Sequence, residues 1–117
     1  MAKRATINTV RKYLKVLVEN GIPVTGGVLY GSYARGEETP DSDIDVLVLS
    51  PFFDKNARAK VGKLWSLTRY VDVKIEPVPV GEKRFQTDNV SPLLEIARRE
   101  GIFLKVEERK EKIKASA

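Results

Sequence analysis

The stretch that most limits how this chain can fold is residues 43–50, which read DIDVLVLS and are followed by a proline. After its first residues the stretch is apolar at every position through Leu49, so it has no polar face to turn toward water. A strand that is apolar on both faces is typical of the centre of a covered sheet. We therefore expect residues 43–50 to form a central strand that ends at Pro51.

Helical and strand patterns alternate along the rest of the chain. The spacing of apolar residues, with caps and stops, predicts helices over residues 5–20, about 56–70 and 92–100, the last with Ser91 as N-cap and Pro92 in the first turn. Strands are expected over residues 24–30, 71–80 and 102–106, and polar connections over residues 37–42 and 81–90. This order predicts an α/β (α+β) fold in which helices flank a small mixed sheet.

The length of the chain allows one hydrophobic core. It has 117 residues, of which 42% are hydrophobic, and this is enough for a single globular domain. We predict one domain over residues 1–106 and a charged tail over residues 107–117. No apolar run approaches the roughly 20 residues that cross a bilayer, and the first residues lead into an amphipathic pattern. We therefore expect a cytoplasmic protein that does not contact a membrane.

The composition also excludes several kinds of chemistry. The chain has no cysteine and no histidine, so disulfides, thiolate nucleophiles, cysteine-based zinc sites and imidazole catalysis are excluded. An enzyme of this composition would use carboxylates, Lys, Arg and Tyr. The formal net charge is +5. Because basic residues are scattered among acids, we interpret this excess as a mixed, solvated surface, with direct nucleic-acid binding left open.

A glycine–serine pair, Gly31-Ser32, follows the expected strand 24–30 and opens an expected helical turn that runs through Arg35. A glycine lets the main chain come close to a ligand, and the free N–H groups and the serine hydroxyl favour an anion such as phosphate. A plain strand-to-helix turn with Ser32 as its N-cap would explain the same two residues.

Two aspartates, Asp43 and Asp45, lie two positions apart on the expected central strand, so both side chains project from one face. Two ionised carboxylates this close repel each other and need a counter-charge. Mg²⁺ or Mn²⁺ would supply it, because these ions prefer oxygen ligands and bridge carboxylates to substrate phosphates. Solvation at the edge of the strand, or pairing with Lys and Arg, is the alternative.

The spacing of these two motifs carries a resemblance to a known family. Gly31-Ser32, ten intervening residues and Asp43-Ile44-Asp45 resemble the signature of the DNA polymerase β-like nucleotidyltransferase superfamily, above all its prokaryotic minimal nucleotidyltransferases (MNT). The similarity extends over roughly Val10 to Leu104 and includes the segments LYGSYARG and GIFL. It implies the nucleotidyltransferase fold and transfer of a nucleoside monophosphate, AMP from ATP, to a hydroxyl group.

The resemblance also implies roles for residues that match the motif. Asp43 and Asp45 would bind two Mg²⁺ ions, with Mn²⁺ as an alternative. Gly31 and Ser32 would hold the β- and γ-phosphates of ATP or another nucleoside triphosphate. Arg35 would reach the same phosphates or remain a solvated surface residue.

A third carboxylate is expected from the next strand. Asp72 matches the family position and would be both a metal ligand and the base that accepts the hydroxyl proton. Glu76 lies on the same face of that strand and is its rival. Lys74 departs from the apolar residue that usually follows the third acid.

Minimal members of this family commonly pair with a small helical HEPN protein, a toxin-like ribonuclease. They can act as its antitoxin by nucleotidylating one of its tyrosines, so the resemblance implies a HEPN partner here. Two alternatives remain open. The chain could be a non-catalytic binding module that neutralises a partner by contact, or a transferase that acts on a small molecule or on RNA. The retained acids favour an active enzyme.

Overall fold

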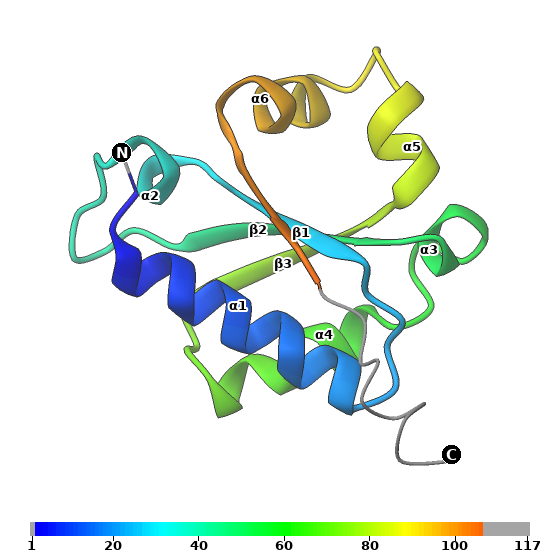
Figure 1. The fold of residues 1–117 in the computed structure, drawn as a ribbon, viewed down its shortest axis with the longest axis horizontal. Helices are drawn as coiled ribbons and strands as arrows, with labels where there is room; N and C mark the ends of the chain where they lie inside the picture. The colour runs from blue at the N-terminus through cyan, green and yellow to red at the C-terminus, as the bar shows by residue number, and fades with distance from the viewer. Residues whose placement is uncertain (1, 107–117) are drawn as a thin grey trace, which may run out of the picture.

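The computed structural model describes residues 2–106, which form one four-stranded mixed sheet with helices on both of its faces (Figure 1). The strands are β1 (Gly26–Tyr30), β2 (Ile44–Ser50), β3 (Ile75–Gly81) and β4 (Ile102–Lys105). Their spatial order is β3-β2-β1-β4, with β1 antiparallel to both of its neighbours and β2 parallel to β3. The expected α/β fold with a small mixed sheet and the central position of β2 are thereby confirmed.

The helices divide between the two faces. Their bounds are α1 (Arg4–Glu19), α2 (Ser32–Arg35), α3 (Phe52–Lys55), α4 (Val61–Leu67) with the 3₁₀ turn η1 (Thr68–Tyr70), α5 (Glu82–Thr87) and α6 (Pro92–Glu100). Figure 1 shows α1 and α4 on one side of the sheet, and α5 and α6 on the other. Successive residues of a strand face opposite sides, and the buried residues accordingly separate into two clusters, one under each helical layer.

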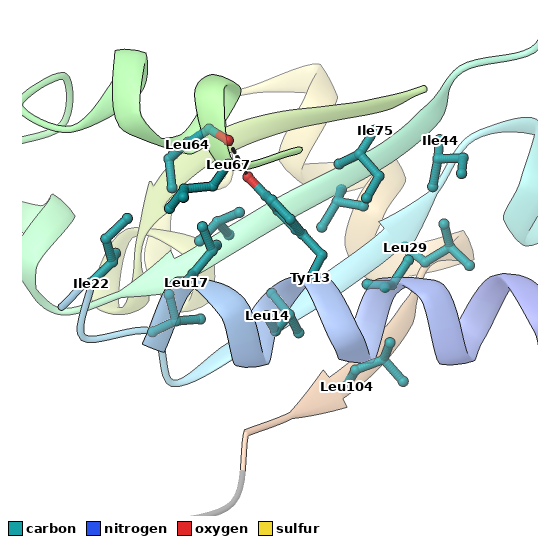
Figure 2. Packing of buried hydrophobic residues seen from close by; sticks show 14 of the residues in the cluster. Tyr13, Leu14, Leu17, Ile22, Leu29, Ile44, Leu64, Leu67, Ile75 and Leu104 are labelled. Atoms are coloured by element: carbon teal, nitrogen blue, oxygen red, sulfur yellow. Dashed lines mark hydrogen bonds between the residues drawn. The ribbon is translucent and has the colours of Figure 1, made fainter. Parts of the chain in front are cut away.

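The larger cluster lies between the sheet and the helices α1 and α4 (Figure 2). Leu14 of α1 fits against Gly27 of β1 so closely that a β-carbon there would be 2.9 Å from Leu14 Cδ1. Tyr13 is fully buried, and its hydroxyl donates a hydrogen bond to the carbonyl of Leu64 at 2.7 Å. This bond satisfies the one polar atom of the tyrosine side chain and joins α1 to α4.

The second predicted helix differs from expectation in its bounds. It does not begin near Asn56, where φ −135° and ψ 66° interrupt the helical conformation. A separate short helix, α3, follows Pro51 directly, and α4 begins only at Val61. Helix α4 buries Leu64 and Leu67, whereas Trp65 is 46% exposed.

The third strand also begins later than predicted, at Ile75 and not at residue 71. Val73, which lies inside the predicted strand, is 76% exposed. The preceding residues form a turn in which the Asp72 carboxylate accepts a hydrogen bond from the amide of Lys74 at 2.9 Å.

The segment 81–90, expected to be a polar connection, contains helix α5. The side chain of Asp54, from α3, caps this helix because it accepts hydrogen bonds from the amides of Lys83 and Arg84 at 3.0 and 3.1 Å. The predicted cap of α6 is confirmed, since the Ser91 hydroxyl accepts a hydrogen bond from the Leu94 amide. None of the helices in residues 2–106 combines the length and apolar character of a membrane span, and the predicted tail, 107–117, lies outside the described residues.

Candidate functional site

Three polar side chains lie in one line across the sheet. The strand register pairs Tyr30 of β1 with Asp45 of β2, and Asp45 with Glu76 of β3. Two residues further along, the same alignment pairs Val28 with Leu47 and Leu47 with Val78, and these residues belong to the smaller cluster beneath α6. Because side chains alternate along a strand, the tyrosine and both acids face the α5–α6 side of the sheet.

The predicted phosphate turn begins where β1 ends, at Gly31. This glycine has φ 79° and ψ −157°, a conformation that other residues rarely adopt. A β-carbon at Gly31 would also collide with the carboxylate of Asp45. Only glycine fits for both reasons, and the main chain of the turn therefore lies directly against Asp45. The structure thus brings the two sequence motifs, ten residues apart, into one place.

The short helix α2 follows this glycine. Its N-cap is Gly31, whose carbonyl accepts hydrogen bonds from the amides of Ala34 and Arg35 at 3.1 and 3.2 Å. Ser32 is therefore the first helical residue and not the N-cap that the alternative interpretation expected. A hydroxyl and main-chain amides beside a carboxylate are groups that can donate hydrogen bonds to a phosphate shared with a metal ion.

Asp43, Asp45 and Glu76 form an acidic cluster. Burial, and next the charge of Asp43, raise the pKa of Asp45, whereas the charge of Arg35 lowers it. The pKa of Glu76 is raised first by the hydrogen bond that its protonated carboxyl donates to Asp43, then by burial and by the charges of both aspartates. Burial, followed by the charges of Asp45 and Glu76, raises the pKa of Tyr30 to about 12. The negative charges of the clustered acids therefore repel one another.

Basic side chains in the described part of the chain do not balance this charge through direct ion pairs. The ion pairs found within residues 2–106 involve none of the three clustered acids. Lys74, next to Glu76 in sequence, instead donates a hydrogen bond from Nζ to the carbonyl of Pro40 at 3.1 Å. That contact and the bond from the Ile44 amide to the Lys74 carbonyl, at 2.9 Å, hold the loop that leads into Asp43.

The structure places the two candidates for the third acid differently. Asp72 precedes β3, and its carboxylate and carbonyl accept hydrogen bonds from the amides of Lys74 and Ile75, respectively, within a turn. Glu76 lies on β3 in register with Asp45 and interacts with Asp43. Glu76 is thus the acid that the fold brings to the two aspartates, while the role of Asp72 stays a prediction.

The residues present fit a divalent cation that is shared with a ligand. Within residues 2–106 no group of three acidic side chains is arranged to hold a metal ion by itself. Mg²⁺, however, is usually held by one or two carboxylates, with substrate phosphates and water completing its shell. Asp43 and Asp45, with Glu76 beside them, offer such a partial shell, and the mutual repulsion of these acids favours a cation there.

Arg35 was expected either to reach the phosphates or to remain a solvated surface residue, and the structure shows it paired with acids. Its Nε lies 2.8 Å from Glu37 Oε1, and its Nη1 lies 3.3 Å from Glu100 Oε1. Sequence reasoning missed Glu100, because no local pattern connects the end of α6 with a turn 65 residues earlier. It also missed Tyr30, although its alternation with Val28 could have placed it on the same face.

Known proteins share this fold. A crystal structure of a "putative nucleotidyltransferase" from Sulfolobus solfataricus superposes with a TM-score of 0.59 at 12% identity, over 85% of this chain and 78% of that one. A toxin–antitoxin crystallised with AMP-PNP gives 0.58 at 24% identity, over 93% and 82%. A mutant of the toxin–antitoxin MntA–HpeT gives 0.53 at 22% identity, over 89% and 77%. At these identities the likeness supports the fold alone.

Sequence comparison gives the family. A "Putative protein adenylyltransferase" of Methanocaldococcus jannaschii is 39% identical over 62 residues, or 53% of this chain. The match spans 58% of the length of that relative. The model of the family described as "Nucleotidyltransferase domain" matches residues 8–114, which is most of the chain. The resemblance seen in the sequence is confirmed, and the chain belongs to the nucleotidyltransferase domain family.

Proposed function

We propose that this protein is a protein adenylyltransferase, which transfers AMP from ATP to a hydroxyl group of a partner protein. The observation that carries the proposal is the contact between Gly31 and Asp45, which joins a turn suited to phosphate with the acidic cluster. The relative from Methanocaldococcus jannaschii, named for protein adenylylation, supports the reaction class. The similar fold of a toxin–antitoxin crystallised with AMP-PNP supports an adenine nucleotide as donor.

In this proposal the acidic cluster holds one or two divalent ions, Mg²⁺ or Mn²⁺, through Asp43, Asp45 and a third acid. Glu76 is our choice for that third acid because of its register with Asp45, and Asp72 is the alternative. A bound ion would neutralise phosphate charge and lower the pKa of the acceptor hydroxyl.

The other groups of the site would bind and orient the nucleotide. The main chain at Gly31 and the hydroxyl of Ser32 would donate hydrogen bonds to the β- and γ-phosphate oxygens. The acceptor oxygen would attack the α-phosphorus, the bond to the β-phosphate would break, and pyrophosphate would leave. The third carboxylate would take the proton of the acceptor hydroxyl, a role that a carboxylate can fill in a protein without histidine.

We further propose that the acceptor is a tyrosine of a HEPN toxin, so that the transferase acts as an antitoxin. The likeness to two toxin–antitoxin structures supports a partner of this kind. The open position of the site supports a macromolecular acceptor, because Asp43 lies exposed at the start of β2 and Arg35 is exposed beside the turn.

A labelling experiment tests the proposal. The purified protein, Mg²⁺ and the product of the neighbouring gene are incubated with ATP that carries a radioactive α- or γ-phosphate. We expect the neighbour to acquire the α label and not the γ label. The Asp43→Asn and Asp45→Asn variants should each lower labelling by at least about a thousandfold, because loss of a metal ligand removes the charge stabilisation of the transition state.

Three further variants serve as comparisons in the same assay. Asp41→Asn, an exposed acid of the preceding loop, should label at the wild-type rate. Glu76→Gln should lose labelling while Asp72→Asn retains it, and the reverse result would assign the third acid to Asp72. Labelling that persists in Asp45→Asn with an unchanged thermal midpoint would contradict the site. Neutralisation of the toxin without any labelling would favour a binding module that acts by contact.

A further inference from the structure

Arg35 is held by two carboxylates that come from different parts of the chain. Glu37 belongs to the loop after α2 and lies 2.8 Å from the guanidinium Nε. Glu100 is the last residue of α6 and lies 3.3 Å from Nη1. The two contacts approach different nitrogens of one rigid, planar group. The two carboxylates therefore restrict both the position and the orientation of the guanidinium.

The end of α6 is itself fixed against the sheet. A β-carbon at Gly101 would collide with the carbonyl of Ala97 and with Cγ1 of Val28, and it would lie 3.2 Å from the carbonyl of Leu29. The chain at Gly101 thus sits directly on β1, just before the turn at Gly31. Since Ala97 is also buried, the end of α6 that carries Glu100 is held against the sheet by packing and not only by ion pairs.

Arg35 is close to the site that it would serve. Its amide donates a hydrogen bond to the carbonyl of Gly31 at 3.2 Å, so the residue lies one turn beyond the glycine that contacts Asp45. This geometry places the arginine at the rim of the acidic cluster, beside the turn that would hold phosphates.

We propose that Glu100 is a positioning residue for nucleotide binding, which with Glu37 fixes Arg35 where its guanidinium meets the β- and γ-phosphates of a nucleoside triphosphate. This inference rests on the proposed function. A guanidinium has five N–H donors, so a hold by two carboxylates is compatible with a contact to a phosphate oxygen. Without such contacts an arginine side chain loses conformational entropy when the nucleotide binds. The two carboxylates order the side chain of Arg35 beforehand and so lower this entropic cost of binding.

A different role for Glu100 makes the opposite prediction. If it only neutralised Arg35, its removal would leave more positive charge beside the phosphates and would tighten binding. If it positions Arg35, its removal weakens binding of those nucleotides that have phosphates beyond the first. The direction of the change and its dependence on phosphate number therefore distinguish the two roles.

Calorimetric titration of the full chain with Mg²⁺ and ATP, ADP or AMP tests the proposal. We expect Glu100→Gln to weaken ATP binding roughly three- to fivefold, the range of a partly exposed ion pair, and to leave AMP binding and the thermal midpoint unchanged. Glu95→Gln, an exposed acid on the same helix, is the matched control and should bind ATP as the wild type does. In an Arg35→Ala background, Glu100→Gln should have no further effect, since it acts through Arg35.

Two results would overturn the positioning role. One is ATP binding by Glu100→Gln that is as tight as in the wild type, or tighter. The other is an equal loss for ATP and AMP, which would show a general disturbance of the site. A wild-type protein that binds no ATP in the presence of Mg²⁺ would instead overturn the proposed function.

Discussion

The two faces of the sheet are built from the same strands and serve different purposes. On the face toward α1 and α4, the inward residues of the central strands are apolar up to Val48: Leu29, Ile44, Val46 and Val48. Ser50, at the end of β2, is buried there too, and its hydroxyl donates a hydrogen bond to the carbonyl of Pro23. On the face toward α5 and α6, the apolar residues Val28, Leu47 and Leu49 give way to Tyr30, Asp45 and Glu76 at the end where β1 stops and β2 begins. One face is closed by helices, and half of the other carries the acids.

This difference shows how a domain of this size accommodates charged groups that repel each other. Successive side chains of β2 face opposite sides of the sheet, so this one strand supplies Val46 to the core and Asp45 to the acidic cluster. A buried charge without a partner costs several kcal/mol, and the closed face has no place for one. We infer that the face of α1 and α4 supplies most of the stability, while the acidic half of the other face supplies the chemistry.

The largest effect on stability should come from a truncation on the closed face. Leu17 of α1 is fully buried, so Leu17→Ala should lower the free energy of unfolding by about 3 kcal/mol through lost burial and a cavity. Urea unfolding measures this loss. Binding of ATP, measured below the unfolding transition, should not change.

Leu93 of α6 is the matched control on the other face. It is 36% exposed, and Leu93→Ala should cost less than about 1 kcal/mol. Nucleotide binding that weakens in Leu17→Ala while the protein remains folded would contradict the separation of the two faces.

A smaller effect is expected from Tyr13, which is fully buried in the closed face. Tyr13→Phe removes the hydroxyl that donates to the Leu64 carbonyl and leaves that carbonyl without its partner. At pH 7 this should lower the free energy of unfolding by about 1–2 kcal/mol. Tyr33→Phe is the control, because Tyr33 is only half-buried and its loss should matter less.

The same substitution should alter the pH dependence of stability. Burial raises the pKa of Tyr13 in the folded protein, whereas in the unfolded chain it is about 10. The stabilisation is therefore complete below pH 10 and is lost as the pH rises above it, because the unfolded tyrosine ionises first. Wild type and Tyr13→Phe, unfolded in urea between pH 8 and pH 11, should converge at the alkaline end. A constant difference across this range would contradict the assigned shift.

The features that the sequence predicted correctly depend on local signals. An apolar run before Pro51 predicted β2, and the Ser91-Pro92 pair predicted the start of α6. The turn at Gly31 could be predicted because the need for a positive φ is a property of one residue. The pairing of that turn with Asp45 followed from strand parity and from the resemblance to nucleotidyltransferases.

The features that the sequence did not predict depend on distant partners. Residues 71–73 alternate as a strand does, but the turn that contains Asp72 delays β3 until Ile75, so that Glu76, the rival of Asp72, is the residue in register with Asp45. Helix α5 begins where a carboxylate from α3, that of Asp54, caps it. Glu100 reaches Arg35 only because α6 packs against β1. None of these contacts leaves a pattern in neighbouring residues.

The smallest effect that we predict lies on the α5–α6 face, at the loop that joins these two helices. Oδ1 of Asp88 accepts hydrogen bonds from the amides of Val90 and Ser91 at 2.9 and 3.0 Å, and Oδ2 pairs with Nε of Arg84 at 3.0 Å. The two amides, and next the arginine, lower the pKa of Asp88 to about 2. Asp88→Asn should therefore destabilise the protein slightly at pH 7.

Measurements at acid pH test whether the charge of Asp88 causes this stabilisation. A lowered pKa means that the stabilisation by Asp88 is complete above its unfolded value of about 3.9 and is lost as the pH falls from there toward about 2. The difference in urea midpoint between wild type and Asp88→Asn should thus be constant from pH 7 to pH 5 and should shrink below pH 4. An unchanged difference in urea midpoint at pH 2.5 would contradict a role of the charge of Asp88. It would show that the hydrogen bonds to the two amides stabilise the loop and that asparagine does not reproduce them. Binding of ATP should be the same in both proteins, because this loop belongs to the apolar half of the face and not to the half that carries the acids.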